Sequence, residues 1–357
     1  YLLLSGLDRN DNRHAIKLID LSTNTITHKW NLHYDSVFSN TPEDGGSYKL
    51  FSKERLRMFH PLLMDDGSII FNTQEGPLVR IDACSGHVWT NNHHFHHSIE
   101  IDADRDIWVN TVIFDKTKGY PKVHLWDKNK KIREDGIARI DENGSILEEI
   151  SLLKVLQDNG YTGLLYGTRM FVEDRIHAND ATPALEDGKY WKKGDLLISL
   201  RDLSTVFLYR PSTGKILWLK TGPWLFQHDT DFIDDSKISI FGNQTIPENG
   251  TFTGKGASDI FIYDFENDTV STPYKDILRE SGFYSRAEGR SRVLEDGRLF
   301  VEETIRGRLM MLSENDIIWS FINRYDENNI GQISWSRYYQ PHEISDALNS
   351  LKHLRCN

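Results

Sequence analysis

The sequence predicts an all-β protein, a six-bladed β-propeller of four-stranded antiparallel blades that is closed by strands from both termini. Two observations predict it: one β-rich unit recurs along the whole chain, and polar turns separate the apolar runs within each unit. The first runs of the six copies end at Asp20, Asp82, Asp141, Arg210, Asp264 and Leu312. The spacing between successive end residues fits four-stranded blades with long loops, because known blade repeats run at roughly 40–50 residues.

Each unit is built from hairpins. An acidic or glycine-containing turn precedes an apolar run in most copies, as at residues 65–67 before 68–71 and at residues 295–297 before 299–301. Turn residues between apolar runs are the signal of a β-hairpin. Each blade is therefore expected to run from an innermost strand through two middle strands to an outer strand. Only residues 150–157 look helical, and they are interpreted as a loop insertion.

The sixth blade is predicted to be split between the two ends of the chain. Residues 1–4, 16–20 and 25–30 supply its outer three strands, and residues 332–339 are expected to supply the innermost one. Such a closure removes the open sheet edge that invites aggregation. Residues 1–357 are thus interpreted as one propeller domain, and six spaced repeats weigh against a β-sandwich.

Composition limits the function. The 357 residues carry a net charge of -11 with no basic stripe, which argues against a nucleic-acid partner. No apolar run approaches the roughly 18 residues of a membrane span. The first residue is Tyr1 rather than Met, so a native leader or anchor upstream is left open. Pairing of Cys84 with Cys356 and the oligomeric state are left open as well.

Histidine recurs near the start of the predicted innermost strands. The four residues concerned are His60, His97, His177 and His228. Because these strands converge on the propeller axis, their first residues are expected to gather at one mouth of the channel. A repeated turn-capping role is the structural alternative. The remaining nearby histidines fit no repeat position and are interpreted as loop residues: His93, His94, His96 and His124.

Arg201 is a further polar candidate for this mouth, since it follows the apolar run 196–200. It is either a surface cap of that strand or a bidentate clamp for a sulfate, phosphate or carboxylate group.

Five segments together resemble the bacterial arylsulfate sulfotransferase (arylsulfotransferase) family. They are His-Ala-Asn-Asp at 177–180, Gly-Asp-Leu-Leu-Ile-Ser-Leu-Arg at 194–201, Gly-Lys-Ile-Leu-Trp at 214–218, Gln-His-Asp at 227–229 and Phe-Gly-Asn at 241–243. The resemblance implies a six-bladed propeller that transfers a sulfuryl group from a phenolic sulfate ester to a phenol, without a nucleotide donor, cofactor or metal. It also implies small-molecule partners and a periplasmic or other extracytoplasmic location.

The same resemblance implies roles for individual residues. His228 is the histidine that becomes transiently sulfated, so turnover is expected to be ping-pong through a sulfohistidine. His177, His97 and Arg201 are expected to stabilise the transferred group and to move protons. Contacts to the substrate are expected from His60, Asn179, Asn243 and either Tyr338 or Tyr339.

Two other functions remain open from the sequence. A ring of axial histidines could hold a metal in an oxygenase or lyase, because imidazole suits several transition metals. Arg201 argues against this reading, since a guanidinium beside the site would oppose a cation. The other alternative is a non-catalytic binding propeller that presents its loops to a partner.

Overall fold

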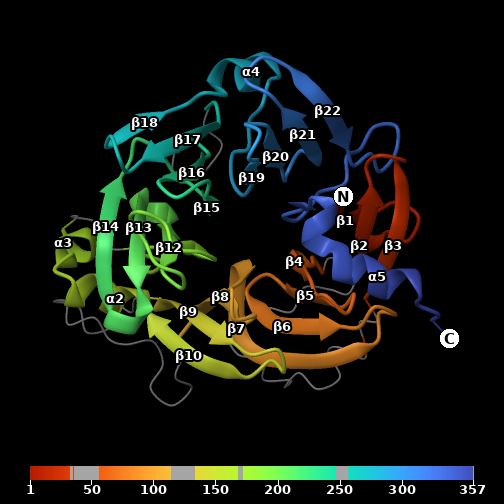
Figure 1. Ribbon diagram of the computed structural model, residues 1–357, viewed down its shortest axis with the longest axis horizontal. Coiled ribbons are helices and arrows are strands. Elements are labelled where there is room, and N and C mark those ends of the chain that lie inside the picture. The colour runs from red at the N-terminus through yellow and green to blue at the C-terminus, as the bar shows by residue number, and fades with distance from the viewer. Residues whose placement is uncertain (33–34, 36–55, 114–132, 168–171, 247–255, 357) are drawn as a thin grey trace.

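The computed structural model describes residues 1–357 except 33–34, 36–55, 114–132, 168–171, 247–255 and 357. Antiparallel sheets are arranged in a ring around a central axis (Figure 1). Three of the four-stranded sheets follow the chain in order: β11 (Ala178–Pro183), β12 (Leu196–Leu200), β13 (Thr205–Arg210) and β14 (Lys215–Thr221); β15 (Thr230–Phe232), β16 (Lys237–Gly242), β17 (Asp259–Asp264) and β18 (Thr269–Ser271); β19 (Arg290–Val293), β20 (Leu299–Glu303), β21 (Arg308–Leu312) and β22 (Ile317–Ile322). The all-β propeller fold predicted from the repeats is confirmed.

The prediction of six separate four-stranded blades is wrong. The described residues form four four-stranded blades and one seven-stranded sheet. The strands of the larger sheet are β4 (Phe59–Leu63), β5 (Ile69–Asn72), β6 (Gly76–Ile81), β7 (His87–Ile101), β8 (Ile107–Val112), β9 (Asp135–Ile140) and β10 (Ile146–Ser151).

The physical reason lies in β7, a single strand of 15 residues. The repeat pattern predicted two strands here, the outer strand of one blade and the inner strand of the next. No Gly or Pro interrupts it, and Phe95 pairs with Gly76 of β6 on one side and with Thr111 of β8 on the other. Two expected blades are therefore joined into one continuous sheet.

The fourth four-stranded sheet combines strands from the N-terminal and C-terminal regions of the chain. Its order is β23 (Arg337–Tyr338), β1 (Leu2–Asp8), β2 (Arg13–Asp20) and β3 (Thr25–Asn31). Leu2 lies opposite Tyr338 and Leu3 opposite Arg337, and an isolated bridge joins Gly6 to Ile333. Pairing of the last strand with the first closes the ring.

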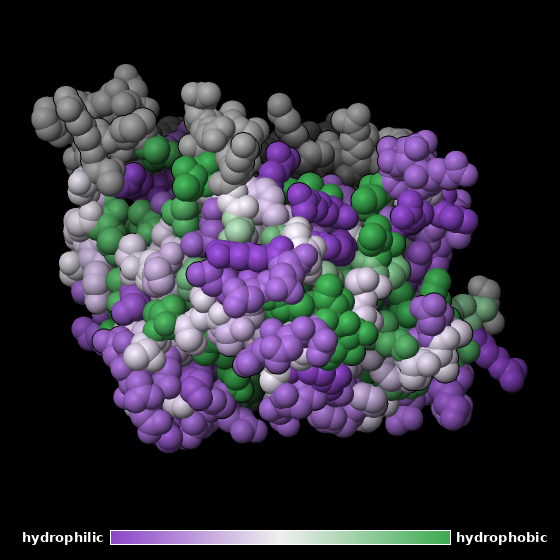
Figure 2. Space-filling view, turned by 90° about the horizontal axis from the view of Figure 1, so that it is seen from above, coloured by the Kyte–Doolittle hydropathy of each residue, from purple (hydrophilic) through white to green (hydrophobic). Residues whose placement is uncertain are grey.

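Apolar residues of the strands pack between neighbouring sheets. Leu197, Val206 and Leu208 of one sheet, for example, belong to one core cluster with Ile238 and Ile240 of the next sheet. The side of the molecule seen in Figure 2 is mainly hydrophilic with scattered hydrophobic residues. The described residues include four short α-helices outside the strands: α2 (Leu152–Asp158), α3 (Thr162–Tyr166), α4 (Lys275–Glu280) and α5 (Ser345–Lys352). In the described part of the chain, none of the helices has the length and apolar character needed to span a membrane.

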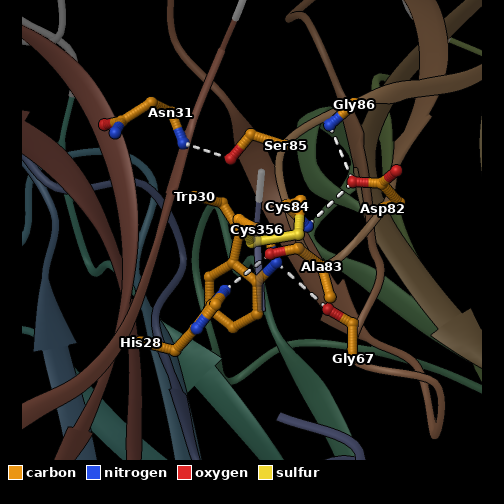
Figure 3. The surroundings of a disulfide bond; sticks show 10 residues. All are labelled: His28, Trp30, Asn31, Gly67, Asp82, Ala83, Cys84, Ser85, Gly86 and Cys356. Atoms are coloured by element: carbon orange, nitrogen blue, oxygen red, sulfur yellow. Dashed lines mark hydrogen bonds between the residues drawn. A yellow bond between two sulfur atoms is a disulfide. The ribbon is translucent and has the colours of Figure 1, made fainter. Parts of the chain in front are cut away.

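A disulfide between Cys84 and Cys356 fastens the C-terminal segment to the seven-stranded sheet (Figure 3). Beside it, the buried Trp30 donates from Nε1 to the carbonyl oxygen of Gly67 at 3.0 Å, and His28 Nε2 donates to the carbonyl of Ala83 at 2.7 Å. The two cysteines are separated by 272 positions in the sequence. A cross-link over so long a loop stabilises a fold by about 2–5 kcal/mol, so it reinforces the closure made by β23.

Candidate functional site

An uncommon backbone conformation marks the inner ends of the sheets. His60, His97 and His177 have positive φ angles of 52°, 55° and 46°. In each case the strand pairing shifts register at or next to the histidine. Left-handed backbone costs a non-glycine residue about 1–3 kcal/mol and persists where the surroundings impose it. The fold therefore forces these three side chains out of the regular strand alternation.

His228 occupies a different position in this pattern. The residue with positive φ in its segment is Phe226, at 51°, so His228 stands two positions after it. All four histidines were predicted to occupy the same position of the repeat. The backbone angles show that His228 lies two residues further along its repeat than the other three.

The flanking residues of the Gln-His-Asp segment tie His228 to neighbouring sheets. Gln227 Nε2 donates to Ser199 Oγ at 3.0 Å, and to the carbonyl of Leu200 at 3.1 Å. Asp229 Oδ2 accepts the backbone N–H of Ser291 at 2.8 Å. Both partners belong to other sheets, so the segment is held from both sides and His228 has a fixed position.

The His-Ala-Asn-Asp segment makes the same kind of contact. Asn179 Nδ2 donates to the carbonyl of Gln227 at 2.8 Å, and Asp180 Oδ2 accepts the backbone N–H of Thr230 at 2.7 Å. Burial, followed by the charges of Glu100 and Asp231, raises the pKa of Asp180 to about 7. These two residues connect adjacent sheets, and neither lines the cavity described next.

A cavity of about 200 Å³ opens where the inner ends of the sheets meet. Its lining residues are Phe59, Gln74, Glu75, His96, His97, His177, Arg201, His228, Ala287, Glu288 and Trp335. The structure thus brings His97, His177, His228 and Arg201 together around one cavity. The ring centroid of His97 lies 5.0 Å from that of His177 and 6.2 Å from that of His228.

The other predicted substrate contacts lie outside this lining. His60 is buried in a separate cluster, and Tyr338 stacks on Phe300 with ring centroids 5.9 Å apart. Tyr339 donates its backbone N–H to the carbonyl of Tyr1 in the closing sheet. Asn243 lies directly behind His228 and contacts its ring rather than the cavity.

The contact with Asn243 determines which nitrogen of His228 carries the proton. Asn243 Nδ2 donates to the carbonyls of Ser285 at 2.8 Å and Glu288 at 2.7 Å, which leaves Oδ1 as the atom that faces His228 Nδ1 at 2.6 Å. An amide oxygen only accepts, so Nδ1 must donate. Nε2 then bears the lone pair, in agreement with the backbone N–H of Glu288 that points at it from 3.2 Å.

Burial and nearby charge keep the rings of His228 and His97 neutral. Burial lowers the pKa of His228 to about 3, with a further contribution from the Arg201 charge. Burial, followed by the charges of His177, His96 and His228, holds the pKa of His97 well below its usual range. At neutral pH the Nε2 atom of His228 is therefore available as a nucleophile.

Each of the other two histidines also uses its Nδ1 atom. His177 Nδ1 lies 2.5 Å from Asp174 Oδ2, and His97 Nδ1 lies 2.8 Å from Nδ1 of His96. With Nδ1 engaged in this way, Nε2 is the ring nitrogen of each histidine that is left for a contact with substrate.

A family model described as arylsulfotransferase (ASST) matches residues 60–324. The chain belongs to the arylsulfotransferase family. The family resemblance inferred from the five sequence segments is confirmed, and membership supports a sulfotransferase-like function with small aryl substrates. No curated protein matches the chain.

Solved structures match the chain at low sequence identity. A protein of unknown function from Bacteroides caccae is 14% identical, with a TM-score of 0.55, and the match covers 94% of this chain and 97% of that one. Virginiamycin B lyase from Staphylococcus aureus is 12% identical with a TM-score of 0.43, covering 91% of this chain and 74% of that one. At such identities the likeness to the first structure shows the fold alone.

Several residues at the site of this family member were missed by sequence reasoning. Glu288 and Trp335 belong to the same cavity, and they also have positive φ angles, of 60° and 53°. They share the positive φ angle of His60, His97 and His177 at the start of an inner strand. No sequence signal marked them, because neither a glutamate nor a tryptophan is unusual at such a place. His96, interpreted as a loop residue, lies within β7 and lines the cavity; His93 and His94 also lie in β7, and His124 is outside the described residues.

Two carboxylates at the cavity are paired with arginines. Glu288 accepts from both terminal nitrogens of Arg57, at 3.2 and 3.0 Å, and Glu75 accepts from Arg133 at 2.9 Å. Arg201 contributes a positive charge close to His228, and its Nε donates to Asp202 at 2.7 Å. Within the described ranges, no three His, Cys, Asp or Glu side chains are grouped as metal ligands.

Proposed function

We propose that this protein transfers a sulfuryl group from a phenolic sulfate ester to a phenolic acceptor, with His228 as the transient carrier. The observation that supports this most strongly is the contact between His228 Nδ1 and Asn243 Oδ1, at 2.6 Å. It leaves an unprotonated Nε2 at a cavity that also contains Arg201, His97 and His177. A neutral imidazole with a fixed tautomer is a competent nucleophile near neutral pH.

The first half-reaction begins with attack of the His228 Nε2 lone pair on sulfur. The bond from sulfur to the aryl oxygen breaks, and its electron pair leaves on that oxygen as a phenolate, which takes up a proton. The second half-reaction reverses these steps with another phenol, whose oxygen attacks sulfur while the bond to Nε2 breaks and returns its electron pair to the ring.

Arg201 and the backbone at Glu288 supply the electrostatic support that this chemistry needs. The three non-bridging oxygens of the sulfuryl group carry negative charge throughout the transfer. A guanidinium at the cavity favours that charge, and donors already held in place lose little in reorganisation. The Glu288 N–H, which donates to Nε2 from 3.2 Å, is a further hydrogen-bond donor beside the atom that attacks sulfur.

Mass spectrometry tests the proposal directly. Incubation with 4-nitrophenyl sulfate and no acceptor should release about one equivalent of nitrophenol and add one sulfuryl group to the protein. Added phenol should then restore continuous turnover. The His228→Ala variant should show neither the burst nor the mass increase, whereas the His93→Ala variant, altered at a histidine outside the cavity lining, should retain both. Continued transfer by His228→Ala near the parent rate would overturn the covalent mechanism, and a parent protein inert to all aryl sulfates would overturn the function.

An extracytoplasmic location is part of the same proposal. Its support is the disulfide between Cys84 and Cys356, since structural disulfides persist mainly in oxidising compartments. Thiol-reactive labelling of protein taken directly from its native cells should leave both cysteines unmodified until a reductant is added. Labelling of both cysteines before reduction would argue for a reducing compartment.

A further inference from the structure

Three of the four histidines that line the cavity, His97, His177 and His228, differ in the group that contacts Nδ1. His228 faces an amide oxygen, His97 faces another imidazole, and His177 faces the carboxylate of Asp174. The partner of Nδ1 decides what a histidine does best. A neutral acceptor keeps the ring neutral, whereas a carboxylate stabilises the positive ring that forms when Nε2 holds a proton.

Asp174 is placed to act on His177 alone among these three. Its Oδ2 lies 2.5 Å from His177 Nδ1, and the nearest arginine nitrogen, Nη1 of Arg133, is 3.9 Å away. Burial raises the pKa of the Asp174 carboxyl, but the hydrogen bond from His177 and the charges of His177, Arg133 and Arg201 outweigh burial, so the net shift is downward. The carboxylate is therefore ionised and can only accept, which makes His177 Nδ1 the donor.

Among the residues that the structure describes, no carboxylate is hydrogen-bonded to the ring of His228 or His97. Asp135 Oδ1 lies 3.8 Å from Nε2 of His96, the ring that contacts His97. Asp135 also accepts from Arg133 at 2.7 Å and from the backbone N–H of Ala178 at 2.9 Å. His177 is thus distinguished by a direct carboxylate at Nδ1.

We propose that Asp174 is a positioning residue that makes His177 the proton donor to the departing phenolate and the proton acceptor from the incoming phenol. This inference rests on the proposed function and adds a division of labour to it: His228 carries the sulfuryl group, and His177 carries the proton. When the bond from sulfur to the aryl oxygen breaks, the proton on His177 Nε2 passes to that oxygen and leaves a neutral ring. The acceptor phenol later returns a proton to the same Nε2 as its oxygen attacks sulfur.

The dependence of the rate on the leaving group tests this role. A nitrophenolate is stable enough to leave without a proton, whereas an unsubstituted phenolate needs one, and general acid catalysis is worth about 10²–10⁴-fold. The Asp174→Asn variant should therefore release phenol from phenyl sulfate at least about 100-fold more slowly than the parent. It should cleave 4-nitrophenyl sulfate within about tenfold of the parent rate and still form the label on His228.

A matched control is available on the surface. His93 Nε2 lies 2.6 Å from Glu149 Oε1, so Glu149→Gln removes a carboxylate from another histidine that is remote from the cavity lining. This variant should leave both donors unaffected. The His177→Gln variant should show the same selective loss as Asp174→Asn, and combining the two substitutions should add less than about threefold, because they act on one step.

Equal slowing of both donors by Asp174→Asn, or full additivity with His177→Gln, would overturn the inference while leaving sulfuryl transfer intact. If the Asp174→Asn variant does not fold, the His177→Gln variant alone provides the test. Equal slowing of both donors in that variant would again overturn the inference. A parent protein without activity on either donor would instead be a failure of the proposed function.

Discussion

Two buried histidines near the propeller axis, His228 and His60, show how different the surroundings of one residue type can be. In the described part of the chain, the ring of His228 is hydrogen-bonded to one side chain, that of Asn243, and the residue lines the cavity with Nε2 unprotonated. His60 Nδ1 lies 3.1 Å from Arg290 Nη1 and 3.1 Å from Arg337 Nη2.

The arginines around His60 also bind Glu100, each at 2.9 Å. Burial, followed by the charges of Arg290, Arg337 and His97, holds the pKa of His60 well below its usual range, so its ring is neutral and serves as a hydrogen-bond acceptor. One histidine is thus left open for chemistry, and the other completes a buried charged cluster. Residue type and strand position alone did not separate the two.

The largest effect is expected from Arg201, which acts on the His228 side of this comparison. The Arg201→Lys variant keeps a positive charge but loses the planar fork, so kcat should fall about 100-fold while the label on His228 still forms. Single-turnover kinetics with 4-nitrophenyl sulfate measures both quantities. A kcat within threefold of the parent would show that Arg201 does not contact the transferred group.

A smaller effect, on stability, is expected at His60. The His60→Ala variant removes an acceptor from two buried arginines, and unsatisfied buried donors cost about 1–3 kcal/mol. The free energy of unfolding from urea titration should fall by that amount, while kcat should change less than tenfold. His60→Gln, which retains an acceptor, should recover part of the stability. Loss of activity at unchanged stability would instead assign His60 to the substrate site.

The smallest effect is expected from pH. Because the pKa of His228 is lowered to about 3, the ring is protonated only below that pH, and Nε2 stays free from pH 5 to 8. The rate of labelling by 4-nitrophenyl sulfate should therefore vary less than about threefold over this range. A nucleophilic histidine with the ordinary pKa of about 6.5 would lose about thirtyfold at pH 5. Such a loss would show that His228 is less shielded than its burial indicates.

The order of the elements and the family could be predicted from the sequence, because both depend on short contiguous segments of the chain. Alternating apolar runs and turn residues specify strands and hairpins, and the segments around His177, Arg201 and His228 are contiguous enough to identify the family. His97, His177 and His228 were predicted to meet at one mouth because each comes near the start of an innermost strand, and Arg201 was added because it follows a neighbouring strand. All four line one cavity, although His228 is offset from the repeat position of the other histidines.

Contacts between distant segments were decided only by the tertiary structure. The continuity of β7 depends on its pairing with β6 and β8 at Phe95, which a local pattern of apolar runs does not encode. The pairing of Cys84 with Cys356 depends on where the chain end returns. The separate characters of His228, His177 and His60 depend on Asn243, Asp174 and Arg290, which touch them from elsewhere in the fold. Sequence determined which side chains reach the axis, and packing determined their protonation and partners, because the electrostatics of a buried ring are set by whichever atoms the fold brings against it.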